Sequence, residues 1–220
     1  MANSAPRVVR ILAFGDSLTE GHTLQLTHFH PYTHRLQELL RGYNKSISFQ
    51  LDNFGITGEF VQGQMSARLP KILKDNGPYD LVIILGGSND LSEFTLGQEK
   101  ELFEEIRNLH LTSHRHGAKT MLLTIPESDY IFEDMGKDNT SYIKEQGEKG
   151  RILVNAMLRS FANETSDDVI LCDLAKEHPH STLSKEDKSK YWDDGLHYTP
   201  EGYNRMGEIV FDKLKHLYSN

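Results

Sequence analysis

Apolar residues gather in five short runs along the chain, and each run predicts a strand. Four of the runs are almost continuously apolar, which is typical of parallel strands covered on both faces. The second run alternates instead: polar residues separate Ile47, Phe49 and Leu51, as in a half-covered strand at a sheet edge. The predicted strands are Val8 to Phe14, Ile47 to Asn53, Asp80 to Leu85, Lys119 to Ile125 and Val169 to Asp173.

Between the strands the apolar positions recur every three or four residues, the period of an amphipathic helix. Four such helices are predicted, with start and stop signals at several points. These are Pro31 and Gly42 for the first, Asn76-Gly77-Pro78 for the end of the second, Thr95 with Gln98 at capping-box spacing and Gly117 for the third, and Thr199-Pro200 for the start of the last.

Strand and helix alternate along the whole chain, with no repeat or proline-rich linker to divide it. This alternation predicts an α/β fold, a doubly wound five-stranded parallel sheet between two layers of helices. We expect a single domain over residues 1–220, with the strands in the flavodoxin-like order 2-1-3-4-5. In such sheets ligands bind beyond the carboxyl ends of the strands, so the residues just after each strand are the functional candidates.

Two predicted connections, 126–141 and 175–192, are longer than the loops usual in α/β units. The first mixes apolar side chains with acids, so it is either the cover of a modest apolar pocket or a surface insertion. Its apolar members are Tyr130, Ile131, Phe132 and Met135.

The charge balance narrows the class of partner. The 220 residues include 24 Lys and Arg against 32 Asp and Glu, a net charge of −8, which argues against a nucleic-acid-binding surface. No run reaches the ~18 apolar residues of a membrane span, and Met1 to Pro6 has neither the basic nor the apolar region of a signal peptide. We therefore expect a cytoplasmic protein, with its oligomeric state open. The single cysteine, Cys172, is expected to be a buried apolar residue.

A polar turn, Gly15-Asp16-Ser17-Leu18, follows the first strand. A serine on a tight strand-to-helix turn can be a nucleophile whose own N–H faces a reacting carbonyl oxygen. The alternative is that Ser17 only caps the following helix. The strict Gly-x-Ser-x-Gly elbow is absent because Thr19 replaces its second glycine, which speaks against the ordinary α/β-hydrolase fold.

A serine nucleophile needs a base, and the base needs an acid that orients it. Asp194 and His197 stand three residues apart before the last helix, a spacing that puts both side chains on one side of a turn; the alternative is a surface acid–histidine pair. Backbone or amide N–H donors are also required for an oxyanion. Gly58 after the second strand and Asn89 after the third are candidates, and each alone is equally a turn residue.

Taken together, these blocks resemble those of the SGNH, or GDSL, hydrolase superfamily. The matching residues are Gly15-Asp16-Ser17-Leu18, Gly58, Gly87-Ser88-Asn89-Asp90 and Asp194-Gly195-Leu196-His197, in the family's order. The resemblance implies Ser17 as nucleophile, His197 as base and then acid, and Asp194 as the orienting carboxylate. It further implies an oxyanion hole formed by the N–H groups of Ser17 and Gly58 and the side chain of Asn89, and no metal or organic cofactor. Tyr198-Thr199 departs from the proline that many relatives have after the histidine.

The expected function is that of a serine esterase acting on a small-molecule ester, with short acyl groups such as acetyl on a small alcohol or a carbohydrate. A lysophospholipase or thioesterase, acting on longer acyl chains, is the alternative within hydrolases.

Other readings of the same fold are weaker. A phosphoacceptor receiver domain needs an acidic pair after the first strand, where this chain has the single Asp16. A flavin-binding module is suggested only by the hydroxyl-rich turn after Ser17. His28, His30 and His34 lack the further cysteine or carboxylate of a metal set, so a place in a pocket wall or at a helix start is preferred for them.

Overall fold

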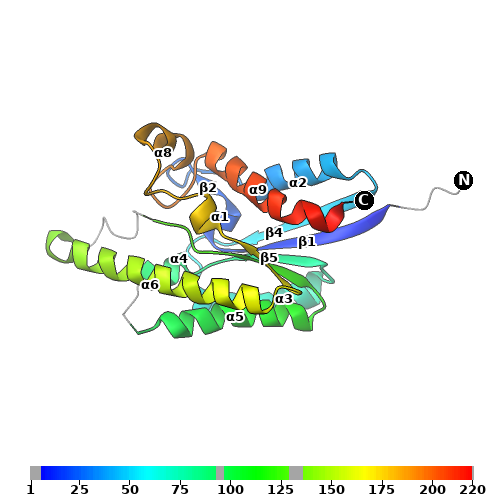
Figure 1. The fold of residues 1–220 in the computed structure, drawn as a ribbon, viewed down its shortest axis with the longest axis horizontal. Coiled ribbons are helices and arrows are strands. Elements are labelled where there is room, and N and C mark those ends of the chain that lie inside the picture. Colours follow the sequence, from blue (N-terminus) through cyan, green and yellow to red (C-terminus); the bar gives the residue numbers. More distant parts are fainter. Residues whose placement is uncertain (1–5, 93–96, 129–135, 220) are drawn as a thin grey trace, which may run out of the picture.

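The structure is a computed structural model that describes residues 6–92, 97–128 and 136–219, with the backbone alone over 136–145 (Figure 1). Five parallel strands form one sheet in the order β4-β1-β5-β6-β7. They are β1 (Arg7–Gly15), β4 (Ile47–Gly55), β5 (Leu81–Leu85), β6 (Lys119–Leu123) and β7 (Val169–Cys172). All five predicted strands and the order 2-1-3-4-5 are confirmed.

Helices cover both faces of the sheet (Figure 1). One layer contains α2 (Tyr32–Tyr43) and α9 (Pro200–Leu214), followed by the short turn η3 (Lys215–Tyr218), and the other contains α3 (Ser66–Asn76), α5 (Glu99–Arg115) and α6 (Gly136–Glu164). Short elements lie between them. These are α1 (Ser17–Glu20), the antiparallel pair β2 (His22–Thr23) and β3 (His28–Phe29), the irregular turn η1 (Val61–Met65), α4 (Ser88–Ser92), α7 (Leu174–Glu177) and α8 (Lys185–Tyr191).

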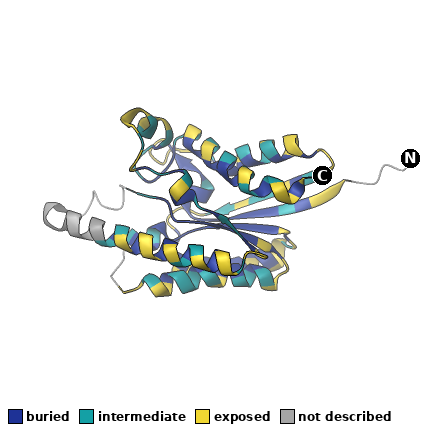
Figure 2. Cartoon of the chain, viewed as in Figure 1, coloured by how far each residue is buried: buried dark blue, intermediate teal, exposed yellow. Residues whose placement is uncertain are grey.

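The alternation of side chains along β1 divides the core in two. Val9, Ile11 and Ala13 pack with the layer of α2 and α9, whereas Leu12 and Phe14 pack with the layer of α3, α5 and α6. In Figure 2 the strands are buried and the exposed residues lie on the outer sides of the helices. A strand buried on both faces has to be almost wholly apolar, which is why this pattern was visible in the sequence.

The strand at the edge behaves as its alternating pattern predicted. In β4, Phe49 is buried and Ile47 and Leu51 are partly buried, while Gln50 is exposed. Its neighbour β1 pairs with it from Arg7 to Gly15, so both strands end level with each other.

Several predicted boundaries are wrong by a few residues. Pro31 is the N-cap of α2 rather than its first residue, and Gly42 lies inside that helix, which ends at Tyr43. Helix α5 begins at Glu99 with Gln98 as its N-cap, so no capping box starts it; Thr95 lies outside the described residues. The stops at Gly77 and Gly117 and the start at Thr199-Pro200 are confirmed.

Both long connections contain helix. Residues 175–192 include α8, and 126–141 run into α6 from Gly136 onward. The apolar residues Tyr130, Ile131, Phe132 and Met135, on which a pocket cover would depend, lie outside the described residues.

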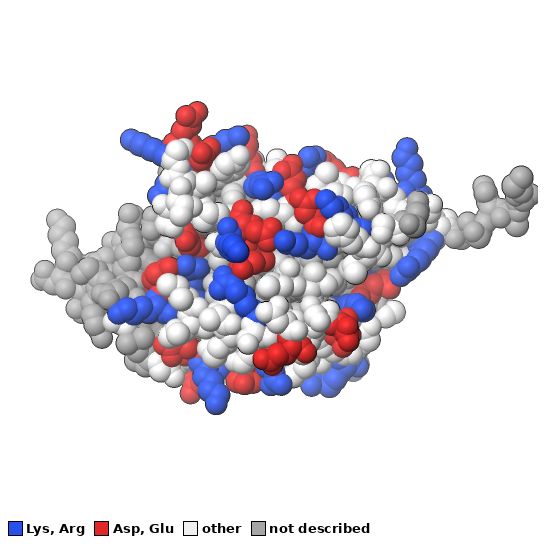
Figure 3. Space-filling model, viewed as in Figure 1, with Lys and Arg blue, Asp and Glu red and all other residues white. Residues whose placement is uncertain are grey.

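The surface carries both signs of charge. Figure 3 shows acidic and basic side chains interspersed over one face, and ion pairs such as Arg35–Glu208 at 3.0 Å and Lys213–Glu177 at 2.9 Å join neighbouring helices. In the part of the chain that the structure describes, no helix is long and apolar enough to cross a membrane.

Candidate active site

The turn after β1 is built so that Ser17 begins a single helical turn. Asp16 has an extended backbone and its Oδ1 accepts a hydrogen bond from the N–H of Leu18 at 3.0 Å, so Asp16 is the N-cap of α1. Gly21 ends the turn at a φ of +90°, in the left-handed region that favours glycine. The alternative in which Ser17 only caps a helix is therefore wrong. Ser17 is 4% exposed.

The turn before α9 holds Asp194 and His197 together. Oδ1 of Asp194 accepts hydrogen bonds from the N–H groups of Leu196 at 3.0 Å and His197 at 2.7 Å, while its Oδ2 lies 2.7 Å from Nδ1 of His197. Thr199 then caps α9 by accepting a hydrogen bond from the N–H of Gly202. One carboxylate thus fixes both the backbone of the turn and the orientation of the imidazole.

The two turns meet although 180 residues separate them. Nε2 of His197 lies 2.9 Å from Oγ of Ser17, and His197 is 4% exposed. With Nδ1–H donating to the carboxylate, the tautomer assigned from these contacts leaves Nε2 free of hydrogen, so it accepts from the serine hydroxyl. The arrangement can move a proton from Ser17 to the imidazole.

The environment of Asp194 keeps it charged. Burial by itself raises the pKa of this carboxyl, but the hydrogen bonds from the ring and the backbone N–H of His197 outweigh it, and the pKa is lowered below its usual value. An ionised carboxylate beside Nδ1 stabilises the imidazolium that forms when His197 takes a proton.

The two other predicted donors follow the strands on either side of β1. Gly58 comes after β4 and Asn89 after β5, and β1 lies between these strands. Nδ2 of Asn89 donates to the carbonyl of Glu59 at 3.0 Å, so Asn89 reaches the segment that carries Gly58. The amide nitrogen carries a second N–H, as an oxyanion donor requires.

Asp16 has no part in the predicted triad or oxyanion hole, although it lies next to Ser17 in the core of this site. Its carboxyl is fully buried, and its Oδ2 has no hydrogen-bond partner among the described residues. Burial raises the pKa of Asp16 to about 7, against the opposing effects of the Leu18 N–H and of His197; the nearby carboxylates of Asp90 and Glu59 raise it further. The signal in the sequence was an acid directly after a buried strand.

We predict a pH-dependent stability that Asp16→Asn removes. Because the carboxyl binds its proton more tightly when folded than unfolded, its contribution to the free energy of unfolding falls as pH rises from about 4 to about 7, by up to about 1.4 kcal/mol per pH unit. Urea unfolding at pH 5, 6, 7 and 8 measures this. The free energy of unfolding of the variant minus that of wild type should rise from pH 5 to pH 7 and stay constant above pH 7. A difference that is the same at pH 5 and pH 8 would contradict the assignment.

The histidines considered as metal ligands have other contacts. Nε2 of His30 lies 3.0 Å from the amide oxygen of Asn204, Nδ1 of His28 lies 2.9 Å from Oγ1 of Thr27, and His34 is in the first turn of α2. Among the described residues no group of three or more His, Cys, Asp or Glu side chains is arranged to hold a metal ion. Cys172 is buried, as expected, and burial raises the pKa of its thiol.

Comparison with known proteins gives one family and one fold. Residues 13–205 match the model of the GDSL-like Lipase/Acylhydrolase family. Among curated proteins no match to the chain is found.

Solved structures similar to this one include a lipase/acylhydrolase from Enterococcus faecalis, with 19% identity, a TM-score of 0.69 and coverage of 95% of this chain and 96% of that one. A carbohydrate acetylesterase family member from Sinorhizobium meliloti has 17% identity and a TM-score of 0.69, with 95% and 98% covered. A GDSL-like lipase from Bacteroides thetaiotaomicron has 19% identity and a TM-score of 0.64, with 94% and 88% covered. At these identities the likeness concerns the fold, and it confirms the predicted α/β sandwich.

Proposed function

The chain belongs to the GDSL-like lipase/acylhydrolase family and is a carboxylic ester hydrolase, and from this we propose that Ser17, His197 and Asp194 carry out the hydrolysis through an acyl-enzyme. The observation that supports these roles is the pair of contacts at His197, 2.9 Å to the Ser17 hydroxyl and 2.7 Å to the Asp194 carboxylate. Nucleophile, base and orienting acid need this connectivity.

In the first half of the reaction, Oγ of Ser17 attacks the ester carbonyl carbon while its proton passes to Nε2 of His197. The negative charge that develops on the carbonyl oxygen is met by the N–H groups of Ser17 and Gly58 and by the amide of Asn89. His197 then gives the proton to the departing alcohol oxygen, and the acyl group stays on Ser17. In the second half a water molecule takes the place of the alcohol, and the acid and free Ser17 result.

Short acyl esters, such as acetyl groups on a small alcohol or a carbohydrate, are the proposed substrates. A hollow of only about 10 Å³, room for about one water molecule, lies beside Asn89 and is lined by Leu91, Ile125 and Pro126. Among the described residues this hollow therefore offers no channel for a long acyl chain, which needs a far larger pocket. The carbohydrate acetylesterase among the structural neighbours supports the same choice of acyl group.

A longer acyl chain is the second candidate, and the β2–β3 hairpin favours it. Leu24, Leu26 and Phe29 are exposed there, and the Phe29 ring lies 4.4 Å from that of His22, whose ring centroid is 6.2 Å from that of His197. Phe29 is thus linked to the base through His22, and the exposed apolar side chains of this hairpin can contact an extended chain.

A series of p-nitrophenyl esters from acetate to palmitate, with acetylated sugars beside it, tests the choice. We expect kcat/KM to be highest at acetate or butyrate and to fall by at least about tenfold at octanoate, since the hollow beside Asn89 offers no channel that would bury the added methylenes. A preference for palmitate over acetate would replace the proposal with the longer-chain alternative. In that case Phe29→Ala should lower activity on the long esters and spare acetate.

A further inference from the structure

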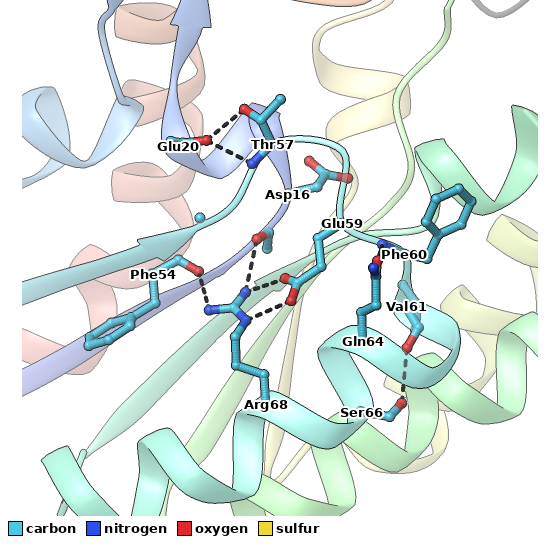
Figure 4. Close-up of polar contacts among 12 residues, drawn as sticks. Asp16, Glu20, Phe54, Thr57, Glu59, Phe60, Val61, Gln64, Ser66 and Arg68 are labelled. Carbon is cyan, nitrogen blue, oxygen red and sulfur yellow. Dashed lines mark hydrogen bonds and ion pairs between the residues drawn. The ribbon is translucent and has the colours of Figure 1, made fainter.

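The segment that carries Gly58 is held in place by hydrogen bonds and an ion pair with side chains from other elements (Figure 4). Glu20, the last residue of α1, accepts hydrogen bonds from the N–H of Thr57 at 2.7 Å and from its Oγ1 at 2.6 Å. Asp90 accepts from the N–H groups of Val61 at 2.9 Å and Gln62 at 3.1 Å. Hydrogen bonds to acidic side chains therefore hold this connection on both sides of Gly58.

Gly58 itself has little around it to fix its position. It is exposed, its φ is +74°, and a Cβ added there would meet no atom within 4 Å. The place of its N–H must then be set through its neighbours Thr57 and Glu59.

The strongest of these ties comes from Arg68 on α3. Its Nε donates to Oε1 of Glu59 at 2.7 Å and one of its terminal nitrogens donates to Oε2, so the carboxylate is bound by two parallel hydrogen bonds. The other terminal nitrogen donates to the carbonyl of Phe54 at 3.0 Å, and the nitrogen that binds Oε2 also makes a longer contact of 3.4 Å with the carbonyl of Gly15. The guanidinium stacks 4.3 Å above the ring of Phe14.

One planar group thus joins three pieces of the site: the end of β1 just before Asp16 and Ser17, the end of β4, and the loop of Gly58. Figure 4 shows the Arg68 side chain reaching from its helix to Glu59 and to the backbone of Phe54. Glu59 is only 7% exposed, so its charge needs this partner.

We propose that the Arg68–Glu59 ion pair is a positioning pair that sets the Gly58 N–H at the right distance from Ser17 to stabilise the oxyanion. The inference rests on the proposed function, since it assigns a task within that reaction. A misplacement of about 1 Å at a reacting centre can cost on the order of 100-fold in rate. Lysine cannot replace arginine here, because a single ammonium cannot bind both carboxylate oxygens and the strand-end carbonyls at once.

Arg10 provides a matched control at the opposite end of β1. It too pairs with a carboxylate, that of Asp52 at 3.1 Å, donates to two backbone carbonyls, and stacks 4.6 Å above an aromatic ring, that of Tyr79. It lies in the amino-terminal half of β1, several residues along the strand from Ser17. Arg10→Met and Arg68→Met therefore remove similar interactions near the two ends of one strand.

The test measures kcat and KM on p-nitrophenyl acetate, and inhibition by butylboronic acid, whose tetrahedral adduct on Ser17 puts an oxygen in the oxyanion hole. Activities are divided by the concentration of intact sites, titrated with a fluorophosphonate.

For Arg68→Met we expect kcat and boronate affinity to fall together by roughly 10- to 100-fold, with KM within about threefold. Arg68→Lys should stay below about a tenth of wild-type kcat. Arg10→Met should keep kcat within about twofold whatever stability it loses, and Asn89→Ala, at about 100-fold, gives the scale for one lost donor.

Wild-type kcat and boronate affinity in Arg68→Met, or full activity in Arg68→Lys, would overturn the inference. The inference would also be overturned if both Arg68→Met and Arg10→Met lowered only the concentration of intact sites and left kcat per site unchanged. That result would mean that both arginines have a purely structural role. These outcomes differ from a failure of the proposed function, in which wild type would not hydrolyse the ester or Ser17→Ala would still do so.

Discussion

Ser17→Ala should abolish ester hydrolysis, with kcat reduced by roughly 10⁶-fold, the scale for removing the nucleophile of a serine hydrolase. The substitution removes the hydroxyl oxygen that lies 2.9 Å from Nε2 of His197, so the nucleophile that the base would activate is lost. The cap of α1 is made by Asp16 and is kept. Initial rates on p-nitrophenyl acetate measure the effect, and urea unfolding shows that the variant is folded.

Ser113→Ala is the matched control for this substitution. Ser113 is also a buried serine, but it lies on α5 and its Oγ donates to the carbonyl of Leu109 in its own helix at 3.0 Å. We expect its replacement to change kcat by less than about threefold. Turnover by Ser17→Ala at a level near that of Ser113→Ala would remove Ser17 from the reaction.

Asp194→Asn should lower kcat by about 10⁴-fold, the effect of the equivalent change in a serine-protease triad. The amide oxygen can keep both backbone hydrogen bonds that Oδ1 now accepts, from Leu196 and His197, so the turn is preserved. The amide nitrogen then faces Nδ1 of His197 and donates to it, which puts the ring hydrogen on Nε2. An imidazole in that tautomer cannot accept the proton of Ser17.

Asp193→Asn separates this effect from a general loss of negative charge near the turn. Asp193 is the adjacent acid, and its carboxylate accepts a hydrogen bond from the N–H of Gln25 at 2.7 Å rather than from the base. Its replacement should leave kcat within a few fold of wild type. Steady-state kinetics on both variants decides: equal, small effects would mean that Asp194 does not orient His197.

Much of the fold could be predicted because burial on both faces leaves a plain record in the sequence. Strands such as Leu81–Leu85 must be apolar at every position, and the polar residues that follow them mark the functional edge. The edge strand was recognised by its alternation for the same reason. Helix ends were less certain at Pro31 and Gly42, because a residue that suits a terminus is also tolerated one position away or inside a helix.

The site could be predicted only where a motif names its residues. Ser17, Asp194 and His197 belong to such motifs, and the structure brings them within hydrogen-bond distance. The β2–β3 hairpin was missed because two-residue strands leave no periodicity. The sequence contains one weak indication of the role of Arg68. This arginine lies between Met65 and Ile72 on the apolar face of its helix, where a cation needs a buried acid as its partner.

Glu59, the acid that pairs with Arg68, belongs to no motif block, although it directly follows Gly58 in the sequence. Pairings of this kind depend on how a loop crosses the end of a helix, and the sequence of the helix alone does not contain that geometry. The raised pKa of Asp16 likewise follows from burial beneath neighbouring turns rather than from its place in the chain.

The central claim is that the hydroxyl of one serine, activated by an imidazole 180 residues away, attacks the ester. Peptide mapping by mass spectrometry after reaction with a fluorophosphonate tests it most directly, since this reagent bonds to the nucleophile that His197 activates. We predict a single adduct on Ser17, formed more slowly when an ester substrate competes. An adduct on another residue, or none while the protein hydrolyses esters at its full rate, would contradict it.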